Sequence, residues 1–161
     1  MYHPQIYYPN SAKSILSVDE SSINSTMTAN KKISLDSTSF SHPNITMSSG
    51  QFVISAGEHL IMGAPTATLV PIGSTTQTEF VYQWYDVTNS QFIGAQGRHV
   101  IIYTHSVINK MRAPVASCYV NTAITLELRC VSLSGAGCDA WGSYPGQGHI
   151  GQSWVSVYTS L

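Results

Sequence analysis

The sequence predicts one all-β domain, an antiparallel sandwich with an extended N-terminal arm. Three observations lead to this class. From residue 51 to the C-terminus, turn-forming residues interrupt short runs rich in β-branched and aromatic residues about every 8 to 12 positions. No stretch of this half repeats its apolar residues at the period of a helix. The length of 161 residues suffices for one hydrophobic core and is short for two ordinary domains.

Residues 1–50 form the predicted arm, and residues 51–161 form the predicted head domain. Between Ser11 and Ser49 the sequence is dominated by Ser, Thr and Asn, and its apolar residues follow no sustained period. Such a segment buries too little apolar surface to form a core of its own. We therefore expect the arm to dock on the head or on a neighbouring subunit, and the head to stay folded without residues 1–30. The residues available for docking are Tyr7, Tyr8, Ile15, Leu16 and Ile33.

The head is expected to contain eight or more strands. The strand-like runs are QFVISAG, HLIMGA, TATLVPIG, TEFVYQWYDV, RHVIIYTHSVI, PVASCYVN, ITLELRCVSL and SWVSVYTSL. The run that begins at Ile124 alternates apolar residues with Thr125, Glu127 and Arg129, which is the pattern of a strand with one buried and one wet face. We expect Glu127 and Arg129 to form a solvent-side ion pair of small energetic worth.

Other strands carry large side chains on both faces. Tyr82 and Trp84 lie on one face of their strand, and Val81 and Tyr85 lie on the other. A lone sandwich would leave one of these faces wet, so we expect a neighbouring subunit to cover it. Alternation alone does not tell which face meets the subunit. The candidates for core or interface are Tyr82, Trp84, Ile101, Tyr103, Tyr119, Trp154 and Tyr158.

A Gly-rich segment, SGAGCDAWGSYPGQGHIGQS from Ser134 to Ser153, is expected to be a long loop. Its rings either face solvent and bind a ligand or turn inward as a packed connector, and the sequence leaves both readings open. Exposed rings that line a groove beside polar side chains would favour sugar binding. The candidate ligand residues are Asp139, Trp141, Tyr144, Gln147 and His149.

The charge pattern argues against nucleic acid and membrane as partners. Only 9% of the residues are charged, the formal net charge is −1, and the largest basic cluster is the pair Lys31 and Lys32. A nucleic-acid binder needs a broader basic surface. No window holds the ~18 apolar residues that span a bilayer, and the N-terminus MYHPQIYYPNSAKS lacks the pattern of a secretion signal. We therefore expect no membrane insertion.

Motifs of catalysis and metal binding are missing from the sequence. There is no GxSxG, HExxH, P-loop or close carboxylate pair, so we expect no enzymatic activity and no cofactor. His99 and His105 share one face of a strand but stand roughly 20 Å apart, too far for one metal ion. We expect structural or solvent-facing histidines rather than a metal site gathered around a symmetry axis.

The three cysteines, Cys118, Cys130 and Cys138, form no CxxC motif. Cys118 and Cys130 lie in apolar strand-like runs, where a reduced cysteine behaves as a small hydrophobic residue. We expect all three to be reduced, with a Cys130–Cys138 disulfide as the alternative.

The order of the motifs resembles a known group of domains. EFVYQWYDVTNSQFIGAQG is followed by a strand, then by RAPVASCYVNTAITLELRCVS, a Gly-rich segment and the terminal SWVSVYTSL. This succession is similar to that of the C1q/TNF-like jelly-roll head domains found in phage and large-DNA-virus proteins, including those of giant viruses and virophages. The resemblance covers residues 51–161. The terminal strand lacks the Phe-Gly pattern usual in the cellular members, which favours the viral branch.

The resemblance implies a jelly roll that assembles as a homotrimer around a three-fold axis. It implies a viral structural or attachment protein without catalysis, located in the virion or in the host-cell cytoplasm during infection. The implied partners are other copies of the chain and a host-surface glycan or protein receptor. The alternative function is a lectin-like, carbohydrate-binding module, because jelly rolls also serve as lectins.

Overall fold

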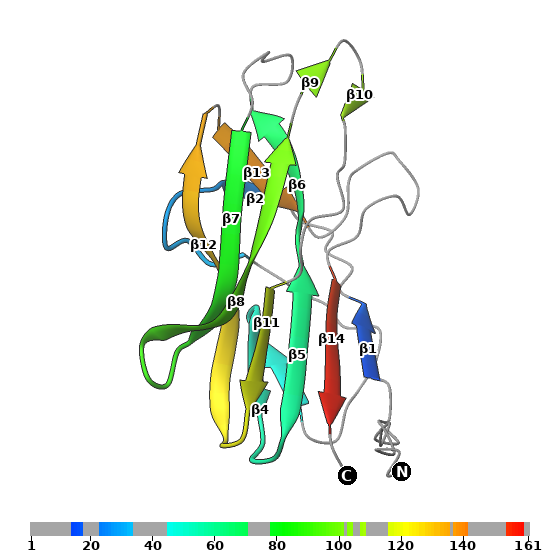
Figure 1. The fold of residues 1–161 in the computed structure, drawn as a ribbon, viewed down its shortest axis with the longest axis vertical. Coiled ribbons are helices and arrows are strands. Elements are labelled where there is room, and N and C mark those ends of the chain that lie inside the picture. The colour runs from blue at the N-terminus through cyan, green and yellow to red at the C-terminus, as the bar shows by residue number, and fades with distance from the viewer. Residues whose placement is uncertain are drawn as a thin grey trace, which may run out of the picture.

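The computed structural model of the chain describes residues 14–17, 23–33, 45–70, 78–101, 103–104, 107–108, 116–135, 137–141 and 154–159. These residues form strands, turns and bends (Figure 1). Among them there is no helix that could cross a membrane. The all-β class predicted from the alternation of side chains is confirmed.

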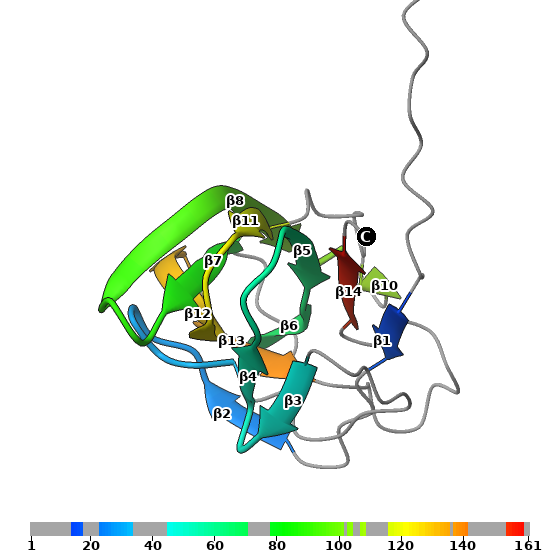
Figure 2. The same cartoon turned by 90° about the horizontal axis from the view of Figure 1, so that it is seen from below.

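Nine strands form one continuous antiparallel sheet in the order β1-β14-β5-β11-β8-β7-β12-β4-β3. The sheet curls around an interior, which Figure 2 shows from one end. The strands of the first wall are β1 (Ser14–Ser17), β14 (Trp154–Thr159), β5 (His59–Ala64) and β11 (Ala116–Val120). Those of the second wall are β7 (Thr78–Asp86), β12 (Ile124–Ser134), β4 (Gln51–Ile54) and β3 (Ile45–Ser48), and β8 (Gln91–Ile101) joins the two walls.

The chain crosses directly between the walls from β4 to β5 and from β11 to β12. β4, β7 and β12 belong to the second wall, whereas β5, β11 and β14, which follow them in sequence, belong to the first. Two small sheets complete the described structure: β2 (Ile23–Thr26) pairs with β13 (Gly137–Trp141), which pairs with β6 (Thr66–Val70), and β9 (Tyr103–Thr104) pairs with β10 (Val107–Ile108). This alternation between two packed walls makes the fold a jelly roll.

Gly94 lies where β8 turns from one wall to the other. β8 pairs with β7 through residues 91–93 and 97–101, and the ladder is irregular between them, where Ala95 lies opposite Ser117 of β11. The backbone at Gly94 has a φ of +73°, and a Cβ built there would stand 1.9 Å from the carbonyl oxygen of Ser117. Only glycine gives both this conformation and this close approach.

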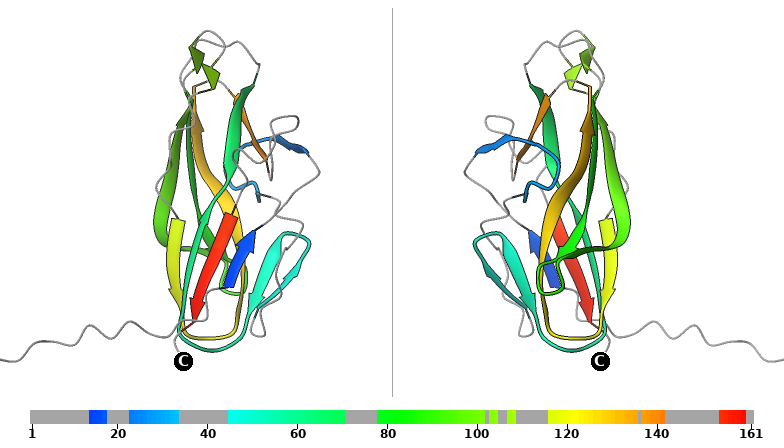
Figure 3. Two further views of the ribbon diagram at one scale, coloured as in Figure 1. Left: turned by 90° about the vertical axis from the view of Figure 1, so that its right-hand side faces the viewer. Right: turned by 90° about the vertical axis from the view of Figure 1, so that its left-hand side faces the viewer.

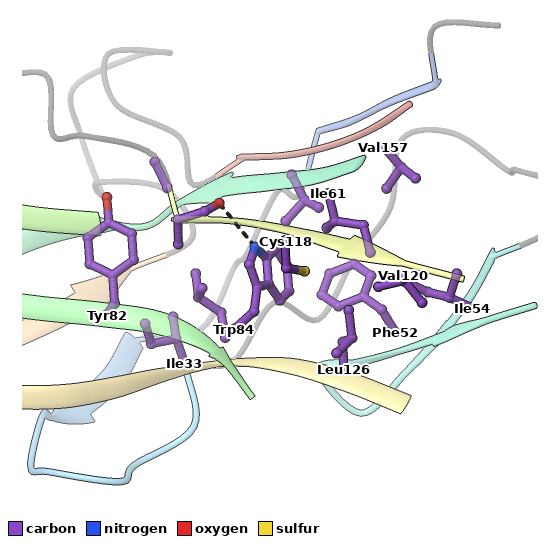
Figure 4. Packing of buried hydrophobic residues seen from close by; sticks show 14 of the residues in the cluster. Ile33, Phe52, Ile54, Ile61, Tyr82, Trp84, Cys118, Val120, Leu126 and Val157 are labelled. Carbon is purple, nitrogen blue, oxygen red and sulfur yellow. Dashed lines mark hydrogen bonds between the residues drawn. The ribbon is translucent and has the colours of Figure 1, made fainter. Parts of the chain in front are cut away.

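The core lies between the walls (Figure 4). Its largest side chain is that of Trp84, which is fully buried and meets Phe52 edge to face with the ring centroids 5.7 Å apart. β12 contributes Leu126, Leu128 and Cys130, which confirms the core-facing side predicted for that strand. The other labelled members in the figure are Ile33, Ile54, Ile61, Tyr82, Cys118, Val120 and Val157.

Parts of the first fifty residues are built into this fold. β1 pairs with β14 (Figure 3), β2 pairs with β13, and β3 pairs with β4. Ile33 and Met27 are fully buried in the core. The main chain of residues 30–33 bonds to β12, through Ile33 N to Leu128 O at 2.8 Å and Cys130 N to Lys31 O at 2.9 Å. Ile33 thus packs on the same chain's jelly roll, and the boundary at residue 50 stays a prediction.

Two expectations are wrong in detail. The segment 134–153 does not begin as a loop, because Ser134 ends β12 and residues 137–141 form β13, which is held between β2 and β6. The ion pair of Glu127 and Arg129 lies on the outer face of β12 but is not an ordinary solvent-exposed pair, because Glu127 is only 2% exposed. Its carboxylate also accepts a hydrogen bond from the side chain of Gln51, 3.0 Å away, which belongs to the neighbouring strand β4.

Candidate interaction face

The outer side of the first wall is the strongest candidate for a binding surface. On β5, His59 and Ile61 are buried, so Leu60 and Met62 have the outward parity, and both are partly exposed. On β11, Cys118 is buried and Tyr119 is 81% exposed. We call the outward positions Leu60, Met62, Ser117 and Tyr119 the Tyr119 face.

The strand register sets these positions in rows across the wall. Tyr119 lies opposite Leu60, and Leu60 lies opposite Tyr158 of β14. In the next outward row of the wall, Met62 of β5 lies opposite Ser117 of β11 and opposite Ser156 of β14. Two large apolar positions beside a tyrosine on one wet sheet surface form the kind of patch that protein interfaces cover.

The first wall also carries no formal charge. Asp, Glu, Lys and Arg are absent from its four strands, whose sequences are SILS (β1), WVSVYT (β14), HLIMGA (β5) and ASCYV (β11). The second wall differs, since β7 and β12 carry Glu79, Asp86, Glu127 and Arg129. Burying the Tyr119 face against another surface would therefore require little desolvation of charge, whereas covering the second wall would require more.

The sequence-predicted aromatic candidates separate into different roles. Tyr82 and Trp84 are fully buried in the core of the single chain. The indole Nε1 of Trp84 donates to the carbonyl oxygen of Ala116, 3.1 Å away. Burial raises the pKa of Tyr82 well above its ordinary value. Tyr119 alone among the candidates whose side chains are described is exposed.

The remaining candidates are placed by their backbones. Trp154 and Tyr158 lie in β14, in register with Ala64 and Leu60. Tyr103 lies in β9, and Ile101 is the last residue of β8. Their core or interface roles stay predictions.

The candidate ligand residues fall into two groups. Asp139 and Trp141 lie in β13, in register with Thr68 and Thr66 of β6. Tyr144, Gln147 and His149 lie outside the described residues. The ligand role of all five stays a prediction.

His99 has a structural environment. Its ring stacks on Phe80 with the centroids 6.4 Å apart and lies 5.6 Å from the Tyr82 ring. Its Nε2 is 2.7 Å from the carbonyl oxygen of Pro65. Burial lowers the pKa of His99, and the hydrogen bond to Pro65 opposes this shift. His105 lies outside the described residues, and within those residues no group of three or more His, Cys, Asp or Glu side chains could hold a metal ion.

Cys118 and Cys130 are free thiols buried in the core, so the expected reduced state is confirmed for these two and the Cys130–Cys138 disulfide is not formed. Burial raises the pKa of Cys118 to about 12, with the nearby Asp86 carboxylate adding to the shift. Burial also raises the pKa of Cys130 to about 11. Both groups therefore remain protonated and poor nucleophiles near neutral pH.

Comparison with known proteins identifies the fold. No protein-family model matches the chain, and no curated protein matches its sequence. Among solved structures, the chain is similar to the Eiger TNF of S. frugiperda, with a TM-score of 0.55 and 10% sequence identity over 95% of this chain and 94% of that one. At this identity the similarity concerns architecture. The chain has a TNF-like jelly-roll fold.

Proposed function

We propose that the chain is a non-enzymatic recognition head that assembles as a homotrimer through the Tyr119 face and serves as a viral structural or host-attachment protein. The observation that carries the assembly is the 81% exposure of Tyr119 in a row with Leu60, on a wall whose strands carry no charged residue. A tyrosine in this position buries a large solvent-exposed area on association, and its hydroxyl can form a hydrogen bond at the polar rim of the interface.

A three-fold arrangement suits this face. A closed ring repeats one heterologous contact between two neighbouring surfaces of each copy, and a sheet face that lies beside the axis supplies both surfaces. The absence of charge from the first wall lets three copies meet at an axis without burying unpaired ions. The resemblance of residues 51–161 to trimeric viral head domains supports the same stoichiometry and the viral role.

Light scattering coupled to gel filtration tests the assembly. We expect a mass about three times the 17.4 kDa of the chain. Tyr119→Arg should dissociate the trimer without unfolding the chain, because the side chain is exposed in the single copy. Val53→Arg is the matched control, since Val53 is 47% exposed but lies on the second wall. A wild-type monomer, or equal dissociation by both variants, contradicts the proposal.

The viral role has its own test. Mass spectrometry of purified particles from an infection that expresses the protein should detect it at the stoichiometry of a structural component. Its absence from the particles would leave the trimeric head without a virion role. The carbohydrate alternative rests on Asp139, Trp141, Tyr144, Gln147 and His149, and specific retention on a glycan array would favour it.

A further inference from the structure

The outer side of the second wall carries a second surface of different chemistry. Cross-strand register sets Phe92 beside Tyr85, Tyr85 beside Glu127, and Lys32 beside Arg129. Val53, which is 47% exposed, lies opposite Thr125 on the same side of β4 and β12. We call Lys32, Val53, Tyr85, Phe92 and Arg129 the Arg129 patch.

Arg129 is held in a fixed position within this patch. Its Nε donates to the Glu127 carboxylate, which is buried and also accepts from Gln51. Its guanidinium carbon stands 3.6 Å from the centroid of the Tyr85 ring, and the Phe92 ring supports Tyr85 edge to face at 5.1 Å. The Arg129 side chain nevertheless remains 24% exposed. A guanidinium immobilised in this way loses little conformational entropy when it binds an anion.

The charges of the patch are not balanced. Lys32 and Arg129 are opposite each other in an antiparallel bridge, an arrangement that like charges disfavour. The Nζ of Lys32 donates to the main-chain oxygen of Ser49 at 2.5 Å, which neutralises no charge. Within the part of the chain that the structure describes, the carboxylate of Glu127 pairs with Arg129. An added anionic group at the surface would relieve the repulsion between Lys32 and Arg129.

We propose that the Arg129 patch docks an acidic protein segment. A carboxylate of the partner binds between Lys32 and Arg129, and separate apolar side chains of the same segment pack on Val53 of β4 and on Phe92 of β8, which lie on either side of β12 and β7. A protein fits better than a sugar, because the guanidinium of Arg129 already covers a face of the Tyr85 ring that a sugar would need for stacking. Tyrosine, phenylalanine and arginine are also the residues enriched in protein interfaces. The patch lies on the wall opposite the Tyr119 face, so it does not depend on the proposed trimer.

Fluorescence anisotropy with a labelled peptide of Glu and Leu residues tests the proposal on the full chain. We expect saturable binding that weakens as salt is added, because the contact is an exposed charge pair. Lys32→Glu should weaken binding by about tenfold or more, equivalent to ~1.4 kcal/mol. Arg98→Glu is the matched control, since Arg98 pairs with Glu79 elsewhere on the second wall and is 58% exposed.

A second variant and two further ligands complete the design. Val53→Glu places a negative charge at an exposed position of the patch. The variant should therefore fold, and it should also bind the acidic peptide more weakly than the wild type. Both variants should keep the oligomeric mass of the wild type, which separates this site from the Tyr119 face. No binding by the wild type, equal binding of a Lys and Leu peptide, equal loss in Arg98→Glu, or binding of a heparin-derived oligosaccharide in place of the acidic peptide would overturn the proposal.

Discussion

The indole of Trp84 in β7 reaches across the interior and donates a 3.1 Å hydrogen bond to the carbonyl oxygen of Ala116 in β11 (Figure 4). Both residues are fully buried. The bond ties the second wall to the first and satisfies a main-chain acceptor that water does not reach. Trp84 therefore contributes both volume and a polar link to the core.

Trp84→Phe should lower the free energy of unfolding by about 2–4 kcal/mol, because it opens a small cavity and leaves Ala116 O without its donor. Urea denaturation followed by circular dichroism measures the loss. Tyr85→Phe is the control, since Tyr85 lies on the outer side of the same strand and the change keeps its ring. Equal effects of the two substitutions would show that the inward hydrogen bond contributes nothing.

Gly94→Ala should lower the free energy of unfolding by more than ~3 kcal/mol, because the added Cβ both disfavours the positive φ and collides with the backbone of Ser117. Gly135→Ala is the matched control: Gly135 also has a positive φ, of 87°, but lies in an exposed bend. The control should lose only about 1–2 kcal/mol. Thermal unfolding of both variants compares their losses of stability. Similar losses would show that the backbone near Ser117 moves away from the new Cβ without an energetic penalty.

Side-chain alternation predicted much of the sheet. The pattern of Ile124, Leu126, Leu128 and Cys130 was enough to assign the inward face of β12, because that face is uniformly apolar. In β7 the same reasoning left both faces open. The reason is that the outer face of β7 also carries a large aromatic side chain, Tyr85. This ring lies under the Arg129 guanidinium and is not part of the core.

Long-range contacts explain what the sequence did not reveal. The buried Glu127 accepts a hydrogen bond from Gln51, which lies 76 positions away along the chain, and no local sequence pattern indicates such a partner. Met27 and Ile33 are buried although their neighbours show no strand period, because residues 30–33 join β12 by a short bridge instead of a full strand. Tyr119 was among the sequence candidates only as a core or interface residue, and its outward position follows from the burial of Cys118 and Val120 on either side of it.

Deletion of residues 1–30 tests the predicted boundary between arm and head. We expect the head to fold but to be less stable by about 2–5 kcal/mol, because the deletion removes the buried Met27 together with β1 and β2. Circular dichroism and thermal unfolding give the result. A truncated chain that does not fold at all would make the first strands an integral part of the jelly roll.

The Cys118 and Cys130 thiols should resist alkylation in the folded protein at pH 8, because burial raises the pKa of both to about 12 and about 11. Mass spectrometry after a brief iodoacetamide treatment should find both peptides unmodified, and modified when urea is present. Native labelling at the rate seen in urea would show that the core around these residues opens readily.

His99 should make the protein less stable in mild acid. Because burial lowers its pKa in the folded state, the unfolded chain takes up a proton first as the pH falls through the ordinary histidine value of about 6.5. The stability contributed by neutral His99 is therefore complete above that pH and is lost below it, toward the lowered pKa. His99→Gln removes the titrating group and keeps a donor for the carbonyl oxygen of Pro65. Urea unfolding at several pH values between 7.5 and 5.5 should show a shallower decline for the variant than for the wild type. Parallel declines would mean that His99 is protonated as readily in the folded protein as in the unfolded chain.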